Sequence, residues 1–138
     1  MELGRDQDAI PFFNQLLEAD YNDEEKFGGL MEEYALYKHR SASQLAQIYL
    51  NTSDFENAAI YIKLFDKKYK YQHFCGNELA AHEIYTAKSY ARLYNGQGKT
   101  EEAIKILLPY IFDNGLASNY SLIDLLSGLL EQQYSKEI

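Results

Sequence analysis

The sequence is poor in the residues that mark several classes of protein. It contains no tryptophan and a single cysteine, Cys75, among 138 residues. One thiol cannot form an internal disulfide, so the composition excludes a disulfide-stapled domain and favours a reducing, cytoplasmic compartment. The first residues lack the apolar core of a signal peptide, because acidic residues and Arg5 follow Met1 closely. The apolar runs, such as residues 106–112, are too short to span a membrane.

Positive charge is scarce as well. The chain has 13 Lys and Arg against 21 Asp and Glu, a formal net charge of −8. Affinity for nucleic acid comes largely from cations that neutralise phosphates, so this balance argues against a nucleic-acid binder. The one lysine-rich run contains Lys67, Lys68 and Lys70. We therefore expect neither nucleic acid nor a membrane as the partner.

Residues 87–110 have the strongest pattern in the chain. Apolar residues there recur three and four positions apart, which is the period of one helix face, and glycines interrupt the pattern at residues 96 and 98. This predicts a helix, a turn and a second helix. The apolar stripe consists of Ala87, Tyr90, Ala91 and Tyr94 before the turn and of Ala103 and Leu107 after it.

The same pattern occurs earlier in the chain, in residues 42–65. When Ala58 is aligned on Ala103, Ser53 falls on Gly98 without any adjustment of the register. The earlier stripe consists of Ala42, Leu45, Ala46 and Tyr49, followed by Ala58 and Ile62. Small residues at four of these positions are expected where the two helices of each hairpin touch most closely; they are Ala46, Ala58, Ala91 and Ala103.

With these residues the chain resembles the tetratricopeptide repeat family, whose pattern runs from an aromatic through L-G-x-x-Y to A-x-x-x-F and a closing proline. Ala42 and Ala87 stand at the first aromatic position, and Lys70 and Gly115 stand where the closing proline belongs. The two copies lie 45 residues apart instead of the family's 34. The larger offset implies an insertion of 11 residues, which predicts longer helices around residues 69–84.

A partial third copy spans residues 3–17, in which Gly4 matches Gly98, Ala9 matches Ala103 and Phe13 matches Leu107. The pattern thus begins at the turn of a hairpin whose first helix is missing. This predicts a fragment of a longer repeat protein, or a family that dispenses with that helix. Pro11 fits a helix that begins near Asp8, because N–H groups of the first turn lack partners.

No segment has the pattern of a strand, so the predicted fold is all-α, a short α-solenoid of about six helices in one domain covering residues 1–138. Its expected parts are the second helix of an incomplete repeat (1–20), two repeats (24–71 and 76–113) and a terminal helix (119–136).

Several local signals predict where the helices begin and end. Ser53 and Glu56 have the spacing of a capping box ahead of a helix expected over residues 55–69, and Asn77 and Thr100 are expected N-caps. Residues 22–51 predict one long helix or two helices broken near residues 39–43. Pro109 is expected to kink or end its helix.

Candidate catalytic groups are weak. Glu78 and His82 lie four residues apart, but no further ligand stands at a suitable spacing, so a solvated helix face is favoured over a metal site. Cys75 could form a nucleophile and base with His39, His73 or His82, but no sequence signature supports this and a structural thiol is favoured. Residues 95–100 lack the spacing of a phosphate-binding loop. We expect no enzyme, no metal and no cofactor.

The resemblance implies a groove lined by the first helix of each hairpin. Carried over to this sequence, the groove residues are Arg40, Ser43 and Gln47 from one repeat and Tyr85, Lys88, Arg92 and Asn95 from the other. None is acidic, which suits a carboxylate-bearing or acidic peptide. Ser43 and Gln47 stand where the family's carboxylate clamp needs other residues, so that clamp is not predicted. The alternative of ordinary solvated helix faces stays open.

The leading hypothesis is a non-catalytic protein–protein interaction scaffold that binds a peptide or partner segment in this groove. The alternative is a regulatory or sensor domain of a larger multidomain protein. An apolar edge beside the missing helix would also allow a homodimer.

Overall fold

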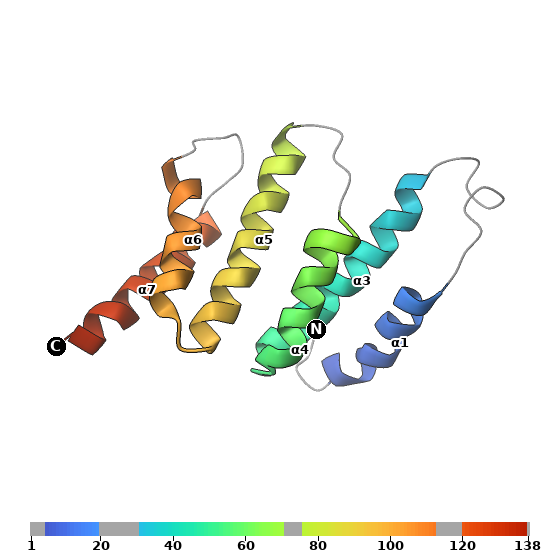
Figure 1. The fold of residues 1–138 in the computed structure, drawn as a ribbon, viewed down its shortest axis with the longest axis horizontal. Helices are drawn as coiled ribbons and strands as arrows, with labels where there is room; N and C mark the ends of the chain where they lie inside the picture. Colours follow the sequence, from blue (N-terminus) through green and yellow to red (C-terminus); the bar gives the residue numbers. More distant parts are fainter. Residues whose placement is uncertain (1–4, 20–30, 71–75, 113–119, 138) are drawn as a thin grey trace. The chain divides into compact units, whose positions relative to one another are not determined.

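Helices make up the whole regular structure of the described chain. The computed structural model describes residues 5–19, 31–70, 76–112 and 120–137, and within these ranges there is no strand. Six α-helices and one π-helical turn are present there, which confirms the predicted all-α fold (Figure 1). The elements are α1 (Asp6–Glu18), α3 (Met31–Asn51), α4 (Phe55–Lys63), η1 (Leu64–Lys68), α5 (Gly76–Gly96), α6 (Thr100–Phe112) and α7 (Tyr120–Glu137).

The chain divides into two compact units, residues 1–72 and residues 73–138. In the N-terminal unit α3 packs against α4 on one side and against α1. In the C-terminal unit α5 and α6 pack side by side, and α7 packs mainly against α6. The division falls between the two predicted repeats. The grouping of both into a single domain over residues 1–138 stays a prediction.

The turn of the C-terminal hairpin is a Schellman motif. The Lys99 N–H donates to the Tyr94 carbonyl at 2.8 Å, and the Gly98 N–H donates to the Asn95 carbonyl at 3.0 Å. Gly98 has φ = 81°, in the left-handed region that a side chain makes unfavourable. These bonds satisfy carbonyls at the end of α5, so the chain can reverse within three residues and start α6.

The N-terminal hairpin has the same turn. The Asp54 N–H donates to the Tyr49 carbonyl at 2.9 Å, and the Ser53 N–H donates to the Leu50 carbonyl at 3.2 Å. Ser53 has φ = 59° and therefore occupies the left-handed position that Gly98 holds in the other unit. The alignment of Ser53 on Gly98 is thus confirmed in the backbone geometry.

The helix that follows this turn begins at Phe55 as predicted, but its N-cap lies one residue later than the capping box places it. Asp54, not Ser53, is the N-cap of α4, and its carboxylate accepts from the Asn57 N–H at 3.2 Å. The Asn57 side chain donates to the other carboxylate oxygen at 2.8 Å. Ser53 cannot cap, because its left-handed backbone belongs to the end of α3. The predicted pair of Ser53 and Glu56 is therefore replaced by Asp54 and Asn57.

The two other N-cap predictions are also wrong. The Lys99 carbonyl accepts the first helical bond of α6, from the Ala103 N–H, so Thr100 is already inside the helix. The Thr100 hydroxyl instead donates to the Asn95 side-chain oxygen at 3.0 Å, which ties the two ends of the turn together. Helix α5 begins at Gly76, so Asn77 is its second residue.

Small residues lie where the paired helices meet, as predicted. Ala46 and Ala58 in the N-terminal unit, and Ala91 and Ala103 in the C-terminal unit, are all completely buried. Burial of an alanine between two helices lets their axes approach more closely than a larger side chain would. The core of the C-terminal unit is completed by α7, through Leu122, Leu126 and Leu129.

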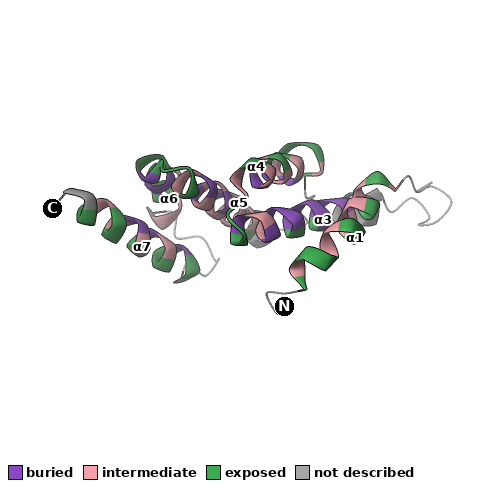
Figure 2. Cartoon of the chain, turned by 90° about the horizontal axis from the view of Figure 1, so that it is seen from below, coloured by how far each residue is buried: buried purple, intermediate pink, exposed green. Residues whose placement is uncertain are grey.

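Helix α1 contributes the least to burial. None of its residues is buried, in contrast to α3, whose described second half is largely buried (Figure 2). It begins at Asp6, so Pro11 is its sixth residue and not a first-turn residue as predicted. Proline has no N–H, so the Gln7 carbonyl loses its helical partner there. The Tyr61 hydroxyl of α4 donates to the Asn14 side chain of α1 at 3.0 Å.

The longer helices follow the predicted course with two differences. Helix α3 runs unbroken from Met31 to Asn51, so the alternative of a break near residues 39–43 is wrong. Helix α6 continues past Pro109 to Phe112. The helix expected to run from residue 55 to residue 69 changes into the π-helical turn η1, which the Tyr69 N–H closes by donating to the Leu64 carbonyl at 2.8 Å.

In the described part of the chain, no helix combines the length and the apolar character that crossing a membrane requires.

Candidate peptide-binding faces

The predicted groove residues of the N-terminal unit share one face of α3. Arg40, Ser43 and Gln47 are spaced three and four residues apart, so their side chains leave the helix on the same side. Arg40 is exposed and Gln47 is half-buried, but Ser43 is buried. Arg40 and Gln47 are therefore the members of this set that present surface to a ligand.

The predicted groove residues of the C-terminal unit share one face of α5. Tyr85, Lys88, Arg92 and Asn95 are spaced three, four and three residues apart, and all four are half-buried. The Lys88 ammonium donates to the Ser121 hydroxyl of α7 at 2.9 Å. This contact extends the face from α5 onto the first turn of α7. Ser121 was not predicted, because nothing in a pattern confined to the hairpin indicates a contact with a residue 33 positions later.

Arg92 is a half-buried cation of this face. Burial lowers the pKa of its guanidinium from the usual value, and the neighbouring Tyr85 opposes that effect. Arginine nevertheless stays charged at neutral pH. A partly desolvated guanidinium interacts more strongly with a carboxylate than an exposed one does, because the local dielectric is lower.

The Asn95 side chain forms a hydrogen bond within the turn of the hairpin. Its side-chain oxygen accepts from the Thr100 hydroxyl, so part of its hydrogen-bonding capacity is used inside the hairpin. Tyr85, Lys88 and Arg92 are thus the residues that the structure brings together as an aromatic and cationic surface on α5.

The stretches of α3 and α5 that carry the predicted face residues contain no acidic residue. The sequence has no Asp or Glu in residues 34–53 or in residues 84–100, although the whole chain carries 21 of them. The faces on α3 and α5 therefore carry positive charge on a chain whose net charge is −8. Such a local field favours a carboxylate over a cation as the bound group.

The candidate catalytic histidines that the structure describes make packing and hydrogen-bond contacts within the fold. His39 is buried, with its Nδ1 2.8 Å from the Tyr69 carbonyl and its ring packed edge-on against Phe65. A carbonyl only accepts, so this nitrogen carries the proton. The ring thereby ties α3 to the end of η1.

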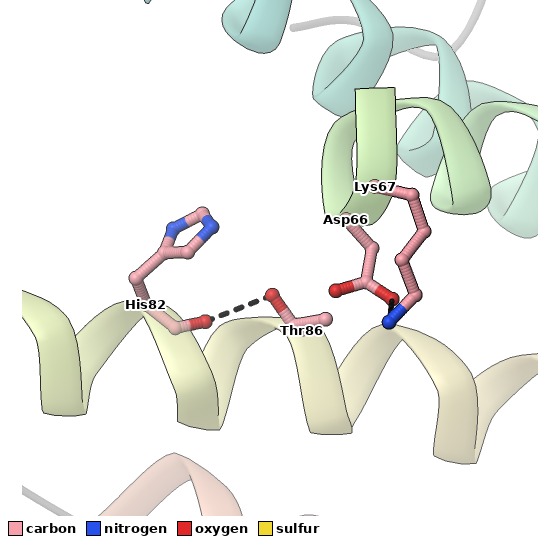
Figure 3. A network of polar contacts seen from close by, with 4 residues as sticks. All are labelled: Asp66, Lys67, His82 and Thr86. Carbon is pink, nitrogen blue, oxygen red and sulfur yellow. Dashed lines mark hydrogen bonds and ion pairs between the residues drawn. The ribbon is translucent and has the colours of Figure 1, made fainter. Parts of the chain in front are cut away.

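His82 is half-buried and stacks on Tyr85, and its main-chain carbonyl accepts from the Thr86 hydroxyl at 3.0 Å (Figure 3). Cys75 and the side chain of Glu78 lie outside the described residues. Within the residues that are described, no three His, Cys, Asp or Glu side chains gather in a way that would hold a metal ion.

Comparison with known proteins gave no relative. No protein-family model, no curated protein and no solved structure matches this chain. The tetratricopeptide resemblance accordingly depends on the aligned residues and on the two equivalent turns, and membership of that family stays a prediction.

Proposed function

We propose that this protein is a non-catalytic interaction module that binds an acidic or carboxylate-bearing peptide segment of a partner protein. In this proposal its two helical hairpins are tetratricopeptide-like repeats, and the first helix of each hairpin supplies the binding face. Each unit carries a face of its own, formed by Arg40 and Gln47 on α3 in the N-terminal unit and by Tyr85, Lys88 and Arg92 on α5 in the C-terminal unit.

The observation that carries the proposal is the aromatic and cationic surface on α5. Three residues of one face offer a ring, an ammonium and a partly desolvated guanidinium, and the sequence has no Asp or Glu in residues 84–100. Arginine can hold a carboxylate through two parallel hydrogen bonds, and lysine adds a point charge. Tyrosine contributes apolar contact area together with a hydroxyl.

A displayed library of random peptides provides the test. We expect the enriched peptides to carry Asp, Glu or a free C-terminal carboxylate. The dissociation constant of a selected peptide should rise at least about tenfold in the Lys88→Gln, Arg92→Gln variant, because two charge-assisted contacts are lost. Fluorescence anisotropy measures this constant directly.

The matched control is Lys99→Gln, Lys105→Gln, which removes the same charge from exposed positions of the same unit. Glutamine is a shorter, uncharged side chain that stays polar, and thermal melts followed by circular dichroism verify that both variants fold. Equal loss of affinity in the two variants, or enrichment of peptides without acidic groups, would contradict the proposal.

A further inference from the structure

Four exposed lysines gather at the end of the second helix of the N-terminal unit. They are Lys63 at the end of α4, Lys67 and Lys68 in η1, and Lys70 just beyond it. We call these four residues the lysine surface. It is separate from the binding face proposed on α3, because it belongs to the opposite helix of the hairpin.

The π-helical turn is what concentrates these lysines. The bond from the Tyr69 N–H to the Leu64 carbonyl closes a wider turn than an α-helix makes. Phe65 inside this turn is completely buried, so the turn is anchored on its inner side and presents its lysines outward. Lys63 lies about one turn before Lys67 and Lys68.

Two lysine ammonium groups lie close to the ring of Tyr69. The ammonium of Lys68 lies 5.3 Å from the ring centroid, and the ammonium of Lys38, a buried residue of α3, lies 5.4 Å from it. Each ammonium is attracted by the ring.

Among the described residues, a single carboxylate forms an ion pair with one of the four lysines of the lysine surface. Lys67 pairs with Asp66 at 3.2 Å (Figure 3). Among the residues that the structure describes, no ion pair joins Lys63, Lys68 or Lys70 to a carboxylate. The sequence from residue 57 to residue 72 contains four lysines and one aspartate. The lysine surface is therefore a local excess of cations on an acidic chain.

We infer that the lysine surface is a second interaction site, which binds a strongly acidic segment of a partner protein. Charge complementarity selects such a segment, since consecutive Asp or Glu residues can meet several lysines at once. A nucleic acid fits less well, because its backbone continues well beyond this small surface and would then meet a chain of net charge −8.

A fluorescently labelled peptide of ten glutamates is the probe. We expect wild-type protein to bind it, and the Lys63→Gln, Lys70→Gln variant to bind it about three- to tenfold more weakly, since two exposed charge contacts are removed. The Lys99→Gln, Lys105→Gln variant should bind as the wild type does. Upon addition of the peptide, the backbone amide signals of residues 63–70 should shift in NMR spectra.

Three results would overturn the inference. The first is equal binding by both double variants, and the second is a set of shifted amide signals that excludes residues 63–70. The third is tighter binding of a single-stranded DNA oligonucleotide of equal charge, which would indicate a nucleic-acid site instead. All four substituted lysines are exposed, so loss of folding is not expected to obscure the comparison.

Discussion

In each hairpin, one residue with a left-handed backbone conformation follows the first helix. Gly98 adopts φ = 81°, and a Cβ added there would meet no atom within 4 Å, so the conformation alone limits which residue fits. Ser53 adopts φ = 59° at the equivalent position and carries a side chain in a region that favours glycine. The same turn is thus made with and without the favoured residue.

This difference predicts opposite effects for two substitutions. Gly98→Ala should lower the free energy of unfolding by about 1 kcal/mol, because alanine is strained at positive φ. Ser53→Gly should raise it by about 0.5 kcal/mol, because the strain of serine is removed at some cost in chain entropy. Urea denaturation followed by circular dichroism measures both.

Gly128 provides the control for this pair. It lies inside α7, at an ordinary φ, and an added Cβ would meet nothing within 4 Å. Gly128→Ala should therefore stabilise the protein, by up to about 1 kcal/mol. If Gly98→Ala and Gly128→Ala changed stability in the same direction, the left-handed turn would not be the controlling feature.

At the scale of the helix pair, close approach depends on the buried alanines. Ala91 is completely buried in the core that α5 shares with α6 and α7. Ala91→Leu should destabilise the protein by about 1–3 kcal/mol, because the added atoms have no space and force the helices apart. The measurement is again urea denaturation.

Ala81→Leu on the same helix is the control, because it makes the same change of residue type at an exposed position and so tests helix propensity without core packing. Ala81 is exposed, so leucine there should change stability by no more than about 0.5 kcal/mol. A similar loss at both positions would show that space inside the core is not the limiting factor.

The sequence predicted the hairpins better than it predicted the helix ends. The period of the alanines identified both helix pairs, because burial requires apolar residues on one face of each helix. The N-caps were misplaced, since Ser53, Asp54 and Thr100 all have cap-forming side chains and only the backbone of the turn decides among them. The π-helical turn η1 has no sequence signal of comparable strength.

At the scale of the whole molecule, the net charge of −8 opposes the local positive surfaces. An acidic peptide is repelled at long range and attracted only when it comes close to the lysines. Raising the ionic strength from about 0.02 M to 0.15 M shortens the screening length. The association rate constant of the ten-glutamate peptide should then increase, while the dissociation rate constant increases more.

Stopped-flow fluorescence at several salt concentrations measures both rate constants. A peptide of ten alternating glycines and serines serves as the uncharged control and should show no binding signal at any salt concentration. An association rate that falls with added salt would mean that the protein's overall field attracts the peptide, contrary to this prediction.

The sequence by itself determined the helical class, the two equivalent hairpins and the small residues between their helices, because these depend on periodic burial along the chain. It also identified the faces free of carboxylates, since these follow from residue type and helical spacing. Only the tertiary structure decided that Ser43 is buried, that Lys88 reaches Ser121, and that Lys38 shares the Tyr69 ring with Lys68. Those contacts join residues of different elements, and their geometry depends on how the helices pack.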